Sequence, residues 1–242
     1  MTEKIVKIGG ASGYWGDTAI GPFQLVEHGD VDYLIFDYLA EITMSILAKA
    51  RARDPEGGYA TDFITRTMQP LLGRIAAKRI KVIANAGGVN LQACRRALEQ
   101  LAQAAGLTLR IGTVEGDNLL PRLEELRRQD IRELDSGVPL PERLMSINAY
   151  LGAFPIAAAL DAGADIVLTG RCVDSALALG PLIHEFGWRP DDYDSLAAGS
   201  LVGHLLECGA QASGGNFTDW ESTVDSWDNT GFPLAEVRAD GS

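Results

Sequence analysis

Short apolar runs alternate with longer segments of helical periodicity along most of the chain. Buried strands are expected at residues 5–8, 33–36, 81–84, 107–114, 145–150 and 166–169. Helices are expected at residues 19–28, 40–53, 63–78, 91–105, 118–129, 155–162, 175–186 and 196–209. This order is typical of an α/β fold, a largely parallel sheet that is doubly wound and carries helices on both faces. A partial β/α barrel is the alternative, since six successive βα units also begin a barrel.

Glycine and polar residues collect directly after the expected strands. They are Gly10, Ser12 and Gly13 after the first strand, Asp37 after the second, Asn85, Gly87, Gly88 and Asn90 after the third, and Arg171 and Asp174 after the last. In a parallel sheet these loops share one edge, where ligands bind. The sequence therefore predicts one ligand cleft at this edge. Each residue alone has a second explanation, because short loops need the same residue types for turns and helix caps.

The loop after the first expected strand has the spacing Gly10-x-x-Gly13-x-x-Gly16. Backbone N–H groups in such a loop before a helix can bind a phosphate or a carboxylate. Gly10, Ser12 and Gly13 are therefore candidate anion-binding residues, and a tight structural turn is the alternative. The spacing matches neither the dinucleotide pattern nor the nucleoside-triphosphate loop, and Tyr14 breaks the nucleophile-elbow pattern around Ser12.

The segment after the third expected strand offers a second place for close approach of a ligand. Two adjacent glycines, Gly87 and Gly88, lie between Asn85 and Asn90 just before a helix. A turn followed by an asparagine cap explains the same residues. Further along, Arg171 is expected to pair with a carboxylate or phosphate through two N–H groups. These five residues complete the set of expected ligand contacts.

Three side chains are candidates for proton transfer: Asp37, Asp174 and His204. Each also has a structural explanation, because Asp174 can cap a helix, Asp37 can be a loop residue and His204 can be a packed histidine. His204, Glu207 and Cys208 share one face of a helix. A single His and Cys do not make a zinc site, so no metal site is predicted and no cofactor is assigned.

Composition narrows the class of protein. The chain has 242 residues, of which 46% are hydrophobic, and a formal net charge of −12. Such a chain can bury one large core or two small ones, and its acidity argues against binding to nucleic-acid phosphates. It has no apolar stretch long enough for a membrane span and no signal-peptide region. The three widely spaced cysteines form no CxxC pair, which favours a reduced, cytoplasmic protein.

Two regions are expected: an α/β core with the glycine-rich ligand edge over residues 1–190, and a second region over residues 191–242. The second region consists of a helix and the start of a truncated C-terminal part. Residues 233–242 are expected to form a strand that runs into an Asp-Gly turn. The partner strand of that hairpin is missing from the sequence. The chain is therefore interpreted as an N-terminal fragment of a longer protein.

Several long stretches resemble one protein family. They are IGGASGYWGD, DYLIFDYLAE, GGYATDF, ANAGGVN, LTGRCVDSALALGPLIHEFGW and GHLLECGAQASGGNF. On these the chain resembles the acyclic terpene utilisation (AtuA-like) family, formerly a domain of unknown function, over residues 7 to about 233. The resemblance carries over no catalytic residue, because the reaction of the family is not established.

The resemblance implies a role in bacterial breakdown of citronellol and geraniol through acyl-coenzyme A thioesters. On this basis we expect an enzyme domain of the hydratase or lyase type, with an anionic, acyl-CoA-like or otherwise carboxylated ligand. A non-catalytic accessory subunit of a terpenoid-degradation complex is the alternative. Either reading allows a homo-oligomer or a partner within a catabolic complex.

Overall fold

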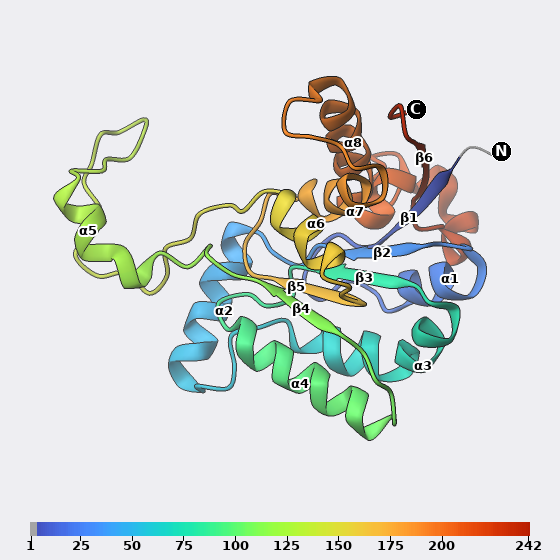
Figure 1. The fold of residues 1–242 in the computed structure, drawn as a ribbon, viewed down its shortest axis with the longest axis horizontal. Coiled ribbons are helices and arrows are strands. Elements are labelled where there is room, and N and C mark those ends of the chain that lie inside the picture. Colours follow the sequence, from blue (N-terminus) through green and yellow to red (C-terminus); the bar gives the residue numbers. More distant parts are fainter. Residues whose placement is uncertain (1–3) are drawn as a thin grey trace.

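The computed structural model describes residues 4–242, and a six-stranded open sheet lies at its centre (Figure 1). The strands are β1 (Ile5–Ser12), β2 (Tyr33–Phe36), β3 (Lys81–Ala84), β4 (Ile111–Val114), β5 (Ile166–Thr169) and β6 (Leu234–Arg238). Their order is β4-β5-β3-β2-β1-β6, and every neighbouring pair is parallel except β1 and β6. The predicted α/β class is confirmed. The barrel alternative is wrong, because β4 and β6 are free edges of an unclosed sheet.

Helices cover both faces of the sheet. They are α1 (Ile20–His28), α2 (Glu41–Arg53), a π-helical segment Phe63–Met68 that leads into α3 (Gln69–Lys78), α4 (Leu91–Ala104), α5 (Leu123–Arg128), α6 (Phe154–Asp161), α7 (Ala176–Phe186) and α8 (Tyr193–Glu207). Short 3₁₀ segments occur at Leu120–Arg122, Gly209–Ser213 and Trp220–Asn229. Figure 1 shows α1 to α4 on one face and α6 to α8 on the other. This is the doubly wound arrangement.

The strand β2 shows why the sequences of the central strands are continuous apolar runs. Leu34 and Phe36 point into the core under α1 to α4, whereas Tyr33 and Ile35 belong to the core under α6 to α8. All four side chains are buried. A parallel strand covered on both faces has no solvent side, so its sequence does not alternate between apolar and polar residues.

The expectation of a strand at residues 145–150 is wrong. The segment is irregular and makes only one isolated bridge, between Asn118 and Asn148. Met145 and Tyr150 are exposed, so the weak apolar pattern here has no core to face. The strand expected at residues 107–114 is also shorter than expected, because β4 begins at Ile111.

The predicted C-terminal strand is confirmed as β6, and its partner among the described residues is β1. β6 pairs antiparallel with β1, with Val237 opposite Val6 and Arg238 opposite Ile5. This partner lies more than two hundred residues earlier in the same chain, and the hairpin strand expected after the Asp-Gly turn stays a prediction. The division expected near residue 190 stays a prediction, and the segment beyond it supplies α8 and β6 to this body.

Residues 119–147 form an arm that extends away from the sheet and contains α5 (Figure 1). Two backbone hydrogen bonds close the base of the arm: Leu119 N–H donates to Ile147 O at 2.8 Å, and Ala149 N–H donates to Asp117 O at 2.8 Å. Leu134 in the arm is 94% exposed. The arm is thus attached to the body at a narrow base and buries little of its own apolar surface.

Candidate functional site

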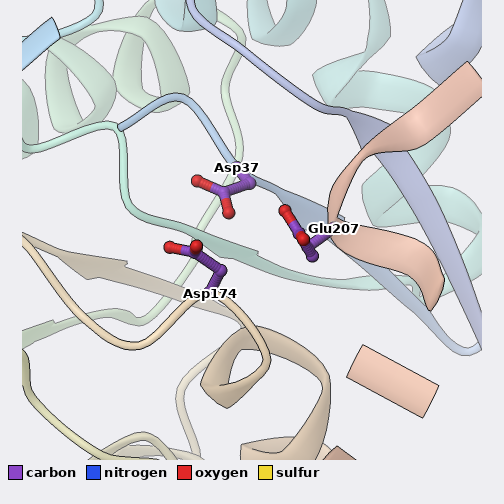
Figure 2. A group of neighbouring side chains, drawn as sticks. All are labelled: Asp37, Asp174 and Glu207. Carbon is purple, nitrogen blue, oxygen red and sulfur yellow. The ribbon is translucent and has the colours of Figure 1, made fainter. Parts of the chain in front are cut away.

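Three carboxylates from separate elements meet at the carboxyl edge of the sheet. Asp37 follows β2, Asp174 precedes α7, and Glu207 is the last residue of α8. One oxygen atom from each lies within 4.8 Å of the other two. Figure 2 shows the three side chains pointing toward one another. Asp37 and Asp174 were expected near a common cleft, and Glu207 is an addition from the structure.

Asp37 is the most deeply buried member, with 3% of its surface exposed. Its Oδ1 accepts hydrogen bonds from Asn85 Nδ2 at 2.6 Å and from Leu39 N–H at 3.2 Å. Asn85 is itself held by Tyr38 N–H, which donates to Asn85 Oδ1 at 2.7 Å. Burial, with repulsion from Asp174, raises the pKa of Asp37 to about 7. A carboxyl group with this pKa can both take and give a proton near neutral pH.

Arg171 joins this site through Asp174. Its side chain is 96% buried, and Nη1 donates to Asp174 Oδ1 at 2.5 Å and to Cys172 O at 3.1 Å. The ring of Tyr150 lies 4.3 Å from the guanidinium carbon. The Arg171 Nε–H has no hydrogen-bond partner among the described residues. Arg171 contacts two carboxylates of the protein itself, Asp174 and Glu41, whose Oε1 lies 3.6 Å from Nη2.

The glycine-rich end of β1 contacts the end of α8. Gly10 and Ser12 were expected in a loop, but β1 extends to Ser12, so only Gly13 of the three follows the strand. A Cβ atom on Gly13 would lie 2.5 Å from the carbonyl group of Cys208, and one on Gly10 would overlap the carbonyl oxygen of Leu206. The amides are also occupied, because Gly10 N–H donates to Pro233 O and Gly13 N–H donates to Asp17 Oδ2, each at 2.9 Å. Close backbone packing accounts for these two glycines, and an anion at this loop has to displace one of those contacts.

Ser12, the third residue expected in this loop to bind an anion, lies beside Asp37. Its side chain is buried, and Oγ is 3.5 Å from the backbone oxygen of Asp37. This contact is with the main chain of Asp37 and not with its carboxyl group. Its role as an anion ligand stays a prediction.

The loop after β3 lines a different space. A cavity of about 320 Å³ at the start of α4 is lined by Arg51, Gly88, Val89, Asn90, Leu91, Gln92, Glu115, Gly116, Asp117 and Asn118. Asn90 Nδ2 donates to Pro55 O and Gly57 O, and Gly87 N–H donates to Thr169 O at 3.1 Å. Gly88 and Asn90 thus border this cavity, whereas Asn85 belongs to the carboxylate cluster.

His204 lies at the margin of the cluster. Its side chain is 77% exposed, and Nδ1 is 3.6 Å from Glu207 Oε1. It therefore reaches Asp37 and Asp174 only through Glu207, and its role in proton transfer stays a prediction. One pattern in the sequence could have pointed to Glu207: it shares a helix face with His204 and directly precedes Cys208 and Gly209.

The cluster of Asp37, Asp174 and Glu207 supports two kinds of chemistry. Three carboxylate oxygens at this spacing are a ligand set for a divalent cation such as Mg²⁺, Mn²⁺ or Ca²⁺. Without a cation, mutual repulsion favours the protonated form of at least one of them near neutral pH, which is the basis of acid–base catalysis. The sequence predicts no metal site because His204 and Cys208 have no second pair of ligands, whereas the three carboxylates are far apart along the chain.

The fold and this cluster define an α/β protein with an acidic site at the carboxyl edge of an open, doubly wound sheet. The chain belongs to the acyclic terpene utilisation family: the profile of the acyclic terpene utilisation family protein AtuA matches residues 6–242. A search of curated proteins and a search of solved structures each return no match. Across residues 4–242, no helix combines the length and the apolar character that a membrane crossing requires.

Proposed function

We propose that the chain is an enzyme domain of acyclic terpenoid catabolism that transfers a proton on a carboxylated intermediate. An acyl-CoA thioester is the first candidate substrate, and hydration or elimination is the reaction class. The observation that carries the proposal is the buried carboxyl group of Asp37, whose pKa is raised to about 7 at a ligand-binding edge of the sheet.

The neighbours of Asp37 suit this role. Asn85 and the backbone N–H of Leu39 fix one carboxyl oxygen, so the other oxygen is the one available to a substrate. Asp174 is held by Arg171 and places a negative charge beside Asp37, which keeps its pKa near the working pH of a cell.

The negatively charged part of the substrate has a candidate location in the cavity at the start of α4. The N-terminal turn of a helix presents unpaired N–H groups and a partial positive charge. Arg51 places a positive charge in the lining beside the carboxylates of Glu115 and Asp117, and Gly88 brings the backbone to the surface of the cavity. The start of α4 and Arg51 are the features of this cavity that support binding of a phosphate or carboxylate group.

Binding and exchange experiments test the proposal. Titration calorimetry of the full chain with coenzyme A and geranyl-CoA is expected to give heat with both ligands. Incubation of geranyl-CoA in D₂O, followed by mass spectrometry, is expected to show deuterium uptake or addition of water. Asp37→Asn should abolish the mass change, whereas the exposed control Asp225→Asn should not. If neither ligand gives heat, an acyl-CoA substrate is excluded. If the mass change proceeds at an unchanged rate in Asp37→Asn, the role of Asp37 in proton transfer is excluded.

The arm of residues 119–147 favours a second candidate, a non-catalytic accessory subunit of a terpenoid-degradation complex. Ile131, Leu134 and Val138 are exposed in the arm, and such surface is often covered by another protein. If this second function is right, the chain should co-purify with a carboxylase of the same pathway. The variant Leu134→Asp should lose that association. A full chain that turns over substrate in the absence of the carboxylase contradicts it.

A further inference from the structure

We propose that the amino edge of the sheet holds a second ligand site, which binds an amphiphilic anion, a small molecule with an apolar chain and a phosphate or carboxylate group. The site lies at the opposite edge from the carboxylate cluster and goes beyond the proposed function. Two neighbouring cavities form it, one basic and one apolar, and both are lined by Arg79 and Lys81. The first residues of β1, β2, β3 and β5 also line these cavities, which places them where the parallel strands begin.

The first cavity has a volume of about 280 Å³ and a basic lining. Four cationic side chains and two acidic ones border it: Lys4, Lys78, Arg79, Lys81, Asp32 and Glu185. This balance is opposite to that of the whole chain, whose formal net charge is −12. A concave surface lined mainly by one sign of charge attracts ligands of the other sign. The cavity therefore favours an anion even though the chain as a whole is acidic.

Three of these cations are not neutralised by the protein itself. Within residues 4–242, Lys78 and Lys81 donate to backbone oxygens and form no ion pair: Lys78 Nζ donates to Val26 O at 2.5 Å, and Lys81 Nζ donates to Ala164 O at 2.8 Å. The guanidinium of Arg79 has neither a hydrogen bond nor an ion pair in the same part of the chain. All three keep their positive charge for a ligand.

The acidic side chains at this edge have donors of their own. Glu185 Oε2 lies 2.5 Å from Lys4 Nζ. Asp32 Oδ2 accepts a hydrogen bond from Lys7 N–H at 2.9 Å. Asp30, whose charge also acts on one of the three cations, accepts a hydrogen bond from Lys7 Nζ at 2.8 Å. These carboxylates are thus held by groups other than the three cations that remain without an ion pair.

The second cavity has a volume of about 440 Å³ and lies between the end of α3 and the segment before β4. Its acidic lining residue, Asp165, accepts a hydrogen bond from Arg110 N–H at 2.8 Å. Most of the lining is apolar: Ile75, Ala76, Ile80, Leu107, Leu109 and Ile166. A cavity of this size and character can hold a small apolar group. Because Arg79 and Lys81 line both cavities, the charged group of such a ligand would lie at one end of its apolar chain.

The backbone at Arg79 has a conformation that favours glycine. Its φ is +59°, directly after the last residue of α3, where helices commonly end in glycine. An arginine at this place adds a guanidinium to both cavities at the cost of backbone strain, a combination that is found at ligand sites. Arg79→Gly removes the guanidinium and relieves the strain, so a loss of binding in this variant cannot be the result of unfolding.

Titration calorimetry of the full chain with octyl phosphate, inorganic phosphate and 1-octanol tests the site. Octyl phosphate is expected to bind at least about tenfold more tightly than either of the others, because it occupies both cavities. Arg79→Gly should weaken its binding by about tenfold and should have a thermal midpoint equal to or above that of the unsubstituted chain. Ala76→Leu, which fills the apolar cavity from α3, should weaken binding of octyl phosphate and leave that of inorganic phosphate unchanged.

Three control variants locate the ligand. Lys49→Gln removes an exposed cation of α2 and should leave the affinity for octyl phosphate unchanged. Arg51→Gln removes the cation of the cavity at the start of α4, and it should also leave that affinity unchanged. Asp37→Asn changes the opposite edge of the sheet and should have no effect on this binding. The acyl-CoA experiments and this titration therefore succeed or fail independently.

Four results overturn the inference. If Arg79→Gly binds octyl phosphate as tightly as the unsubstituted chain does, Arg79 is not part of a site. Loss of binding in Arg51→Gln instead places the ligand at the start of α4. Equal affinities for inorganic phosphate and octyl phosphate show that the apolar cavity takes no chain. If the protein sediments with vesicles of phosphatidylglycerol but does not bind octyl phosphate, the basic residues contact a membrane surface and not a small molecule.

Discussion

Asp37 makes the stability of the protein depend on pH. Its pKa is raised from 3.8 to about 7, so between these values the native state binds a proton that the unfolded chain does not hold. Stability from this group is therefore fully present below about pH 4 and is lost as the pH rises through 7, by up to about 4 kcal/mol in total. Urea unfolding of Asp37→Asn should show a much flatter profile between pH 5 and 8, and Asp225→Asn should keep the slope of the unsubstituted chain.

Arg171 and Asp174 should be coupled in stability. Removing the buried guanidinium in Arg171→Met leaves the carboxylate cluster without its nearest counter-charge and is expected to cost about 3 kcal/mol. The double variant Arg171→Met/Asp174→Asn should cost less than the sum of the single variants, by about 1–3 kcal/mol. Urea unfolding at pH 8 measures the free energy of unfolding of the unsubstituted chain, the two single variants and the double variant. If the two single costs add up to the cost of the double variant, the ion pair between Arg171 and Asp174 does not stabilise the protein. The exposed pair Arg95 and Glu99 is the control, with an expected coupling of a few tenths of a kcal/mol.

The contact between the β1 loop and α8 predicts opposite effects for two Gly→Ala changes. Gly10→Ala places a methyl group against the backbone oxygen of Leu206, which cannot move without shifting α8, and should cost on the order of 2–3 kcal/mol. Gly73 lies inside α3 and has open space around it, so Gly73→Ala should stabilise the chain by about 1 kcal/mol. Thermal unfolding measures both, and a neutral Gly10→Ala would show that the end of α8 is free to move.

The elements of this chain differ in how far they could be predicted from sequence. Buried parallel strands and their following helices, such as β2 with α2, were predicted within one residue at most boundaries because apolar runs and helical periodicity are local signals. The segment at residues 145–150 has a weak apolar pattern of the same kind, but it packs against no core and forms no strand. β6 was recognised as a strand, but its partner β1 could not be, because pairing across the whole chain leaves no local pattern.

At the scale of the whole molecule, most of the candidate site could be predicted from one rule. Loops that follow parallel strands lie along the same edge of the sheet. This rule brought together Asp37, Asn85, Arg171 and Asp174 from three strands that are neighbours in the sheet. Glu207 lay beyond that rule, because it enters the edge from the end of a helix that packs back over the sheet. The helix face that Glu207 shares with His204 is visible in the sequence, but the tertiary path that brings this face to the edge of the sheet is not.

The arm of residues 119–147 should be dispensable for folding of the body. Its two ends are joined by backbone hydrogen bonds of 2.8 Å, and Asn118 and Asn148 already form a bridge across the base, so a short Gly-Ser turn can replace residues 120–146 without moving β4 or α6. The excised segment contributes few side chains to either core, and shortening an exposed loop changes the loop-closure entropy only slightly. We expect a loss of less than about 1 kcal/mol, which corresponds to a thermal midpoint within about 4 °C of that of the full chain.

Light scattering of the same variant bears on the accessory-subunit candidate. If the arm mediates self-association or binds a carboxylase, the excised chain should have the molar mass of one chain and lose that partner, while deuterium exchange at the carboxylate site is unaffected. A variant that unfolds without cooperativity would show instead that the arm is part of the folding unit, for example through the packing of Leu120 and Met145 near α2. The two results separate a surface that serves association from one that supports the core, because only the second changes the unfolding transition.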